Sequence, residues 1–249
     1  MTWHTRTLYG FDTETTGVDV FTDRIVTATI VKIDNGKVAD HRSWLIDPGI
    51  EIPEAATKVH GITTDHARAN GLHPTEALGH IANTLAGVLR ARLPLVVFNA
   101  AYDLSIVEAE TARYDLTGVR AQTEPDHWHT VIDPMVLAKG LEQNLRNKYI
   151  RGTGTYKLPT LCERWGVPFT ETHDATADAV GATLLAIALA ADEPEFTTRS
   201  PLELHTLQKT WRRGHQDSLR RYFDKKGQDH DGVDASWPLH SRLTTAVPA

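Results

Sequence analysis

The sequence predicts an α/β fold in which a mixed β-sheet is flanked by helices and followed by a helical C-terminal extension. Three observations indicate this fold: three strand-like segments come first, short apolar strands then alternate with helical segments, and the composition changes after residue 191. We therefore divide the 249 residues into a domain over residues 1–191 and a charged extension over residues 192–249. One domain with an appendage also fits a typical domain size of about 150 residues.

The first three strands are expected to pair in sequence order. Residues 7–13 (TLYGFDT) are typical of a buried strand, and residues 24–33 form a second one. The dipeptide Asn35-Gly36 that follows is a hairpin signal, so residues 39–45 return beside the second strand. No helical pattern separates these segments, which favours an antiparallel meander.

Helical periodicity follows the meander. Apolar residues spaced by three and four predict a helix near residues 78–89, with Pro74 in the turn that leads into it. Residues 95–98 are wholly apolar, as in an interior parallel strand. One more short strand is expected at residues 130–133, and further helices at residues 104–112, 160–165 and 177–191.

Composition and charge limit the classes of function. Apolar residues make up 41% of the chain and charged residues 23%, and no apolar run reaches the length of about 18 residues that a membrane span requires. No apolar signal segment precedes the first strand, and the single cysteine fits a reducing compartment, so we expect a cytoplasmic protein without a membrane partner. A net charge of −6 argues against coating nucleic acid by charge alone.

Two carboxylates at the end of the first strand carry the strongest chemical signal. Side chains alternate along a strand, so Asp12 and Glu14 lie on the same face. Close carboxylates repel each other and resist burial, so a positive partner is needed between them. Mg²⁺ and Mn²⁺ prefer oxygen ligands and would supply that charge. For this pair alone, two solvated acids at a strand end is the simpler interpretation.

Two further carboxylates lie where they can join this pair. Asp103 follows the apolar strand, at the carboxyl edge where open α/β sheets bind ligands. It also lies near a helix start, so a capping role is its structural alternative. Asp178 lies near the start of the Ala-rich helix, where Asp174 is the competing cap and leaves Asp178 without an obvious structural duty.

His173 lies five residues before Asp178, in the loop that leads into the same helix. A histidine beside a metal cluster can accept a proton from water, although most lone histidines are inert. Carboxylates and one histidine are what two-metal phosphodiester hydrolysis needs, because the carboxylates fix two ions ~3.5–4 Å apart while the histidine takes the proton. We predict His173 as the general base and, as metal ligands, Asp12, Glu14, Asp103 and Asp178.

These segments resemble the motifs of the DEDDh (DnaQ-like) 3′→5′ exonucleases, a family typified by the proofreading epsilon subunit of bacterial DNA polymerase III and by RNase T. Residues 11–17 (FDTETTG) are similar to the first motif of the family, and residues 99–103 (NAAYD) to the second. His173 and Asp178 are similar to the third motif, and residues 59–63 (VHGIT) to a further family feature. The charged extension lies outside the resemblance.

The resemblance implies a ribonuclease H-like fold with a mixed five-stranded sheet. It implies two Mg²⁺ or Mn²⁺ ions as cofactors and hydrolysis from a 3′ end that releases nucleoside 5′-monophosphates. The implied substrate is nucleic acid with a free 3′ end, with DNA preferred, and a DNA polymerase is a candidate partner in proofreading or repair. Matching positions that would line the pocket for the terminal nucleotide are Thr15, Thr16, Ile62 and Asn99.

Several alternatives stay open. An RNA-directed exoribonuclease would use the same chemistry, and a catalytically silent accessory module would bind nucleic acid without cutting it. A silent relative would usually have lost a metal ligand, and none is missing here. The basic stretch over residues 201–226 is interpreted as a helix packed on the domain, with a DNA-guiding arm as its alternative. Cys162 lies among apolar residues and is expected in the core rather than as a nucleophile.

Overall fold

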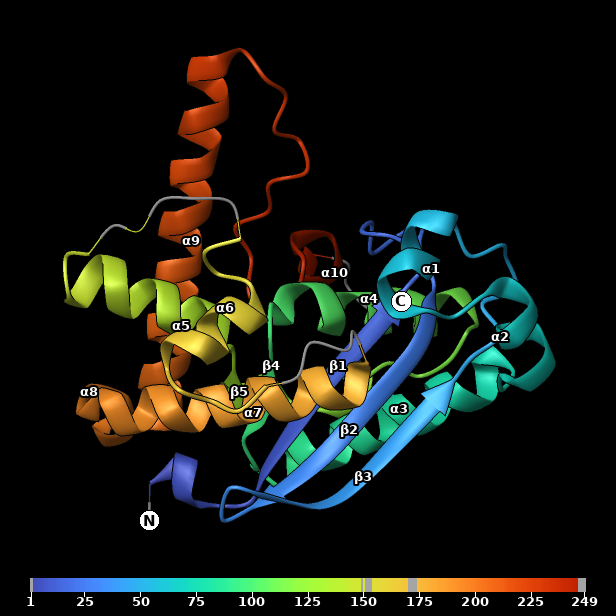
Figure 1. Cartoon of the computed structure of the whole chain (residues 1–249), viewed down its shortest axis with the longest axis horizontal. Coiled ribbons are helices and arrows are strands. Elements are labelled where there is room, and N and C mark those ends of the chain that lie inside the picture. The colour runs from blue at the N-terminus through green and yellow to red at the C-terminus, as the bar shows by residue number, and fades with distance from the viewer. Residues whose placement is uncertain (1, 149, 151–153, 170–173, 246–249) are drawn as a thin grey trace.

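The structure is a computed structural model that describes residues 2–148, 150, 154–169 and 174–245. Its centre is a mixed five-stranded sheet, in the strand order β3-β2-β1-β4-β5, which confirms the predicted fold class (Figure 1). The first three strands pair antiparallel, whereas β4 pairs parallel with both β1 and β5. The strands are β1 (Leu8–Thr15), β2 (Ile25–Asp34), β3 (Lys37–Leu45), β4 (Leu95–Val97) and β5 (Val131–Ile132).

The hairpin between β2 and β3 has the predicted two-residue turn. Asp34 pairs with Lys37, and the residues between them, Asn35 and Gly36, have φ values of 50° and 72°. Two successive positive φ values suit the right-handed twist of the flanking strands, and Asn and Gly adopt them at low cost. The meander therefore follows from local sequence, with β3 starting two residues earlier than predicted.

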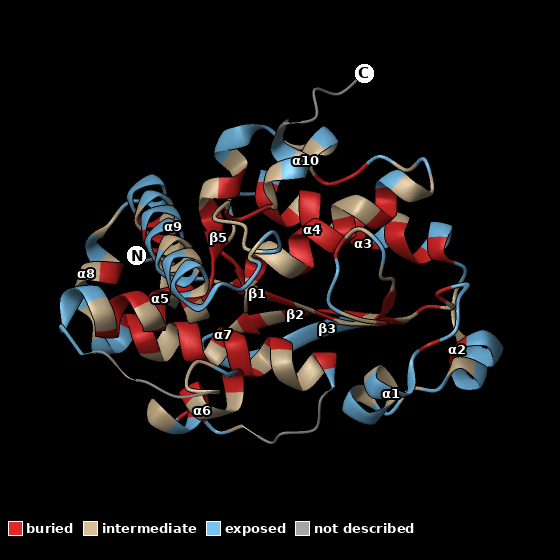
Figure 2. Cartoon of the chain, turned by 90° about the horizontal axis from the view of Figure 1, so that it is seen from above, coloured by how far each residue is buried: buried red, intermediate tan, exposed pale blue. Residues whose placement is uncertain are grey.

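Helices cover both faces of the sheet, with α3 and α4 on one side and α7 on the other (Figure 2). The predicted helices are present, and α1, α2, α5, α8 and α10 were not predicted. The first two bury almost no side chain, Ala67 being the exception, so they have no apolar stripe that a periodicity search could find. The helices are α1 (Glu54–His60), α2 (Thr64–Asn70), α3 (Pro74–Arg90), α4 (Ala100–Arg113), α5 (Pro134–Gly140), α6 (Leu158–Arg164), α7 (Ala175–Asp192), α8 (Pro194–Thr198), α9 (Pro201–Lys226) and α10 (Ser241–Thr245).

The helix α7 packs directly on the sheet, mainly on β1 and β2. Its 18 residues have a mean hydropathy of 1.4, so by length and composition alone it could cross a membrane. Half of that window is buried inside the protein, as in a core helix. The approach to β1 is close: a Cβ added to Gly10 would lie 2.6 Å from the Ala179 carbonyl oxygen and closer still to the Thr183 hydroxyl.

The C-terminal extension contributes to the core through the first half of α9. Leu204, Gln208 and Trp211 are buried there, and the Trp211 ring lies over Gly140. The Gln208 side chain accepts a hydrogen bond from the Asp133 backbone N–H at 2.7 Å. This half of the helix packs on the domain as expected, whereas its second half projects beyond it (Figure 1). The domain boundary after residue 191 stays a prediction.

Gly10→Ala should destabilise the protein, because the added methyl group has no space between β1 and α7. Overpacking of this kind costs about 1–3 kcal/mol of the free energy of unfolding, measured as a lower urea midpoint at unchanged slope. Gly79→Ala is the matched control, since a Cβ at this position in α3 meets nothing within 4 Å. The control should gain up to about 1 kcal/mol of helix propensity. Equal midpoints for Gly10→Ala and the wild type would contradict the close approach.

Candidate active site

Three of the predicted carboxylates come together at the carboxyl end of β1. Gly10 faces α7, and because side chains alternate along a strand, Asp12 and Glu14 face the same helix. Asp178 lies in the first turn of α7. One ligand oxygen from each of Asp12, Glu14 and Asp178 lies within 4.8 Å of the other two. The small-residue contact between β1 and α7 therefore brings the third carboxylate to the first two.

Burial and mutual repulsion disfavour the charged forms of these carboxylates. Burial, followed by the charges of Asp103, Asp178, Glu14 and Asp174, raises the pKa of Asp12 well above its ordinary value. Burial also raises the pKa of Glu14 to about 8, with Asp178 as the next cause. The neighbours that raise both values are all carboxylates. Such a donor set fits a hard divalent cation, which would remove the repulsion.

Asp103 lies beside this group without being part of it. Its carboxylate is 4% exposed and accepts two hydrogen bonds from Thr13, one from the backbone N–H at 3.1 Å and one from the hydroxyl at 2.7 Å. Burial raises its pKa to about 7, and the two bonds from Thr13 limit that rise. Asp103 lies in the first turn of α4 and does not cap it, because Asn99 is at the cap position. Its role as a fourth ligand stays a prediction.

The predicted general base, His173, lies outside the described residues. Its neighbour Asp174 caps α7, as predicted from the sequence. The Asp174 carboxylate accepts a hydrogen bond from the Thr176 backbone N–H at 3.4 Å. This leaves Asp178 one turn inside the helix, at the carboxylate group.

The predicted substrate residues lie around this edge of the sheet. The Thr15 and Tyr102 hydroxyls are hydrogen-bonded to each other at 2.7 Å. Ile62 is half-buried against a small cluster that includes Val26. Asn99 adopts a left-handed conformation, with φ 59°, before α4. Their contacts to a nucleotide stay predictions.

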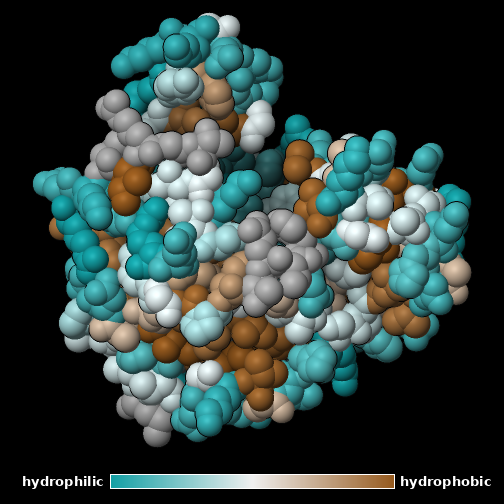
Figure 3. All heavy atoms as spheres, in the orientation of Figure 1, coloured by the Kyte–Doolittle hydropathy of each residue, from teal (hydrophilic) through white to brown (hydrophobic). Residues whose placement is uncertain are grey.

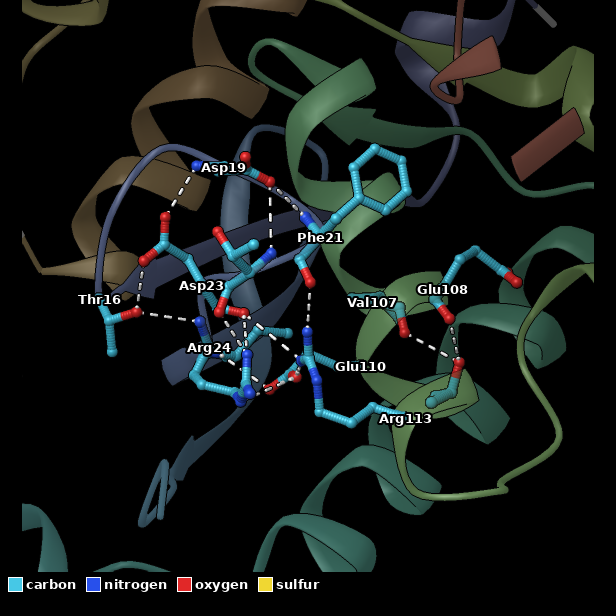
Figure 4. A network of polar contacts seen from close by, with 12 residues as sticks. Thr16, Asp19, Phe21, Asp23, Arg24, Val107, Glu108, Glu110 and Arg113 are labelled. Carbon is cyan, nitrogen blue, oxygen red and sulfur yellow. Dashed lines mark hydrogen bonds and ion pairs between the residues drawn. The ribbon is translucent and has the colours of Figure 1, made fainter. Parts of the chain in front are cut away.

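The loop over residues 16–24 is tied to α4 by a polar network (Figure 4). The Thr16 hydroxyl donates to Asp23 at 2.8 Å and accepts from the Arg24 backbone N–H at 3.0 Å, so this predicted substrate residue has two partners inside the loop. On α4, the buried Glu110 forms ion pairs with Arg24 and Arg113. Thr16, a predicted substrate residue, is thus carried by a loop that α4 holds in place.

Sequence reasoning missed Asp133, a carboxylate that is 1% exposed at the end of β5. It accepts backbone hydrogen bonds from Asn99 and Ala100, at the start of α4, and from the first turn of α5. It also accepts a bond from the Trp237 indole N–H at 3.3 Å. Asp133 thus joins the helix of Asp103 to the C-terminal extension. Its position before a proline at a strand end was the available signal.

The fold and the carboxylate group together define a ribonuclease H-like nuclease. The model of the exonuclease family RNase_T matches residues 9–185, so the chain belongs to that family of DEDD 3′→5′ exonucleases and is a phosphodiester hydrolase by family. This confirms the resemblance found in the motifs.

Individual relatives match most of the chain. PolC-type DNA polymerase III from Caldanaerobacter subterraneus is 28% identical over 197 residues, which cover 79% of this chain and 12% of the polymerase. The corresponding protein from Streptococcus agalactiae is 29% identical over 72% of this chain and 11% of its own length. The chain therefore spans about an eighth of these relatives.

Solved structures of exonuclease I share the fold. One superimposes with a TM-score of 0.64 and 20% identity over 77% of this chain and 42% of its own. Escherichia coli exonuclease I in complex with a dT13 oligonucleotide superimposes with a TM-score of 0.63 and 18% identity, over 76% of this chain and 42% of its own.

Glu14→Gln should stabilise the metal-free protein at pH 8 but not at pH 5. Because the folded-state pKa of Glu14 lies near 8, above its ordinary 4.5, the native state holds the proton that the unfolded state releases. Stability is therefore lost as pH rises through that window, and the variant avoids this loss. In EDTA at pH 8 its Tm should exceed that of the wild type by about 2–4 °C, the shift given by about 1 kcal/mol in a domain of this size.

Two comparisons control this prediction. Glu51→Gln removes an exposed carboxylate from a loop and should leave the Tm unchanged at both pH values. Mg²⁺ at pH 8 should raise the Tm of the wild type more than that of Glu14→Gln. An equal response of both proteins to Mg²⁺ would remove Glu14 from the set of ligands.

Proposed function

We propose that this chain is a 3′→5′ exonuclease that hydrolyses mainly single-stranded DNA and releases nucleoside 5′-monophosphates. The observation that carries this proposal is the group of Asp12, Glu14 and Asp178, whose ligand atoms lie within 4.8 Å of one another. The charged neighbours that shift the pKa values of Asp12 and Glu14 are all carboxylates, so none of them balances the negative charge. A half-buried group of carboxylates is costly to keep unless it binds cations. The cytoplasmic location stays a prediction.

We assign two Mg²⁺ or Mn²⁺ ions to the site. Asp12, Glu14 and Asp178 would hold them, together with Asp103 from α4. When bound, such ions activate water and stabilise the leaving oxygen of a phosphodiester. The chain itself supplies the geometry: α7 sets the position of Asp178, and Thr13 orients the Asp103 carboxylate through two hydrogen bonds. His173 is the group that we propose to accept the proton of the attacking water.

We propose DNA as the preferred substrate because the similar proteins bind DNA or are DNA polymerases. Structures of the structurally similar exonuclease I are complexes with a dT13 oligonucleotide and with single-stranded DNA, and the other relatives are DNA polymerases that contain a matching region. A DNA polymerase is accordingly a candidate partner in proofreading or repair. RNA is the second candidate substrate, since the hydrolytic chemistry is the same and discrimination depends on contacts to the 2′-hydroxyl.

The purified protein should shorten a 5′-labelled DNA strand stepwise from its 3′ end in Mg²⁺, and EDTA should abolish the reaction. Asp12→Asn should lose the activity, because one carboxylate of the group can no longer hold a cation, while Asp65→Asn, in the exposed part of α2, should keep it. A matched RNA strand should be cut more slowly. Faster cutting of RNA would make the chain an exoribonuclease, and activity with Zn²⁺ but not Mg²⁺ would contradict the proposed cofactor.

His173→Ala should lower kcat by about 10²–10⁴-fold without weakening the binding of DNA, because the side chain acts on a proton and is not a proposed ligand. The base must be neutral, so wild-type kcat should rise with pH through the titration of the histidine and then level off. Single-turnover cleavage from pH 6 to 9 measures this rise of the rate with pH, which the variant should lack.

His80→Ala, on the exposed face of α3, is the control and should follow the wild-type profile. A His173→Ala profile that also overlays the wild type would exclude His173 as the base.

A further inference from the structure

The second half of α9, residues 213–226, extends from the edge of the sheet that carries the candidate site. In its first half α9 crosses that edge, where Gln208 binds the backbone at Asp133 directly after β5. Since β1, β4 and β5 are parallel, their carboxyl ends share this edge with Asp12. Fourteen further residues rise above it by about 21 Å at the helical rise of 1.5 Å per residue. We call residues 213–226 the arm (Figure 1).

The arm concentrates positive charge on an acidic protein. It has five basic and two acidic residues, while the whole chain carries −6. Arg220 is used within the fold, because it donates to the Val233 carbonyl oxygen of the segment that returns along the helix. The other basic side chains of the arm are exposed, namely Arg213, Arg221, Lys225 and Lys226. Packing on the domain therefore does not explain their charge.

Apolar and aromatic side chains lie among these cations. Tyr222 is 54% exposed and Leu219 39%, so both present apolar surface to the solvent between the cations. Lys226 lies over the Tyr222 ring, 6.0 Å from its centre. Figure 3 shows the surface hollowed between the projecting end of α9 and the part of the molecule that carries α1 and α2.

We propose that the arm binds the single strand on its 5′ side while the 3′ end occupies the carboxylate site. This inference rests on the proposed function, which supplies the strand. Exposed cations neutralise phosphates, and an exposed aromatic ring stacks on any base, a combination typical of single-strand binding without sequence preference. An acidic protein partner would use the same cations and the same Tyr222 ring. Position favours the single strand, because the arm extends from the sheet edge that carries Asp12.

The test replaces Arg221, Lys225 and Lys226 together by Gln. Point variants are preferred to a deletion, because removing the extension would also take Gln208 and Trp237 out of the interior. The matched control replaces three exposed cations at the opposite end of the sheet by Gln, namely Arg6, Lys37 and Arg90. Both variants should unfold at the wild-type temperature.

The arm variant should show a KM raised at least fivefold for a long single strand and unchanged turnover of a dinucleotide, which is too short to reach the arm. In fluorescence anisotropy with EDTA, the log–log slope of DNA affinity against salt should fall by about 2, at roughly 0.7 per phosphate contact on a single strand. Tyr222→Ala should weaken binding roughly fivefold or more and leave that slope unchanged. The control should match the wild type in each measurement.

The outcomes separate this inference from the proposed function. Normal cleavage with the wild-type KM and salt slope in the arm variant would overturn the role of the arm and leave the exonuclease intact; a protein partner would then be the remaining occupant. If the wild type showed no nuclease activity and only the arm variants lost DNA affinity, the role of the arm would be supported and the proposed function overturned.

Discussion

Mutual repulsion among three half-buried carboxylates is the constraint on which the centre of this protein depends. Asp12 and Glu14 share a face of β1, and α7 adds Asp178 close to both. Burial first, and then the charges of the neighbouring carboxylates, raises the pKa of Asp12 and of Glu14. The groups that shift the pKa values of Asp12 and Glu14 include no cationic side chain, so the packing of the fold must oppose the repulsion. It does so through dense apolar packing of α7 on the sheet and through Gly10, which lets the two backbones approach.

The other side of the site depends on hydrogen bonds instead of close packing. Two bonds from Thr13 hold the Asp103 carboxylate, and Asp133 holds the start of the helix that carries it. Because Asp133 also binds Trp237, the C-terminal extension supports the same helix. A segment without any motif of its own thus becomes part of the support of the site.

Local patterns predicted most of the fold and the positions of the carboxylates. Strand alternation placed Asp12 and Glu14 on one face, and the competition between Asp174 and Asp178 for the cap of α7 assigned each its place. The helices α1 and α2 were not predicted because they bury almost no side chain and so lack a periodic apolar face. The structural role of Asp133 was not predicted because backbone N–H groups of a distant segment donate to it, and backbone groups do not appear in side-chain patterns.

The contact at Gly10 has a consequence for how this sequence can change. Backbone and short side chains meet there directly, so the distance between α7 and β1 is set by van der Waals contact of these atoms and not by the rotamers of large residues. Apolar residues elsewhere in the core can exchange volume with one another while the spacing of the carboxylates stays the same. Chemistry that requires fixed distances is thereby separated from a core whose composition is free to drift.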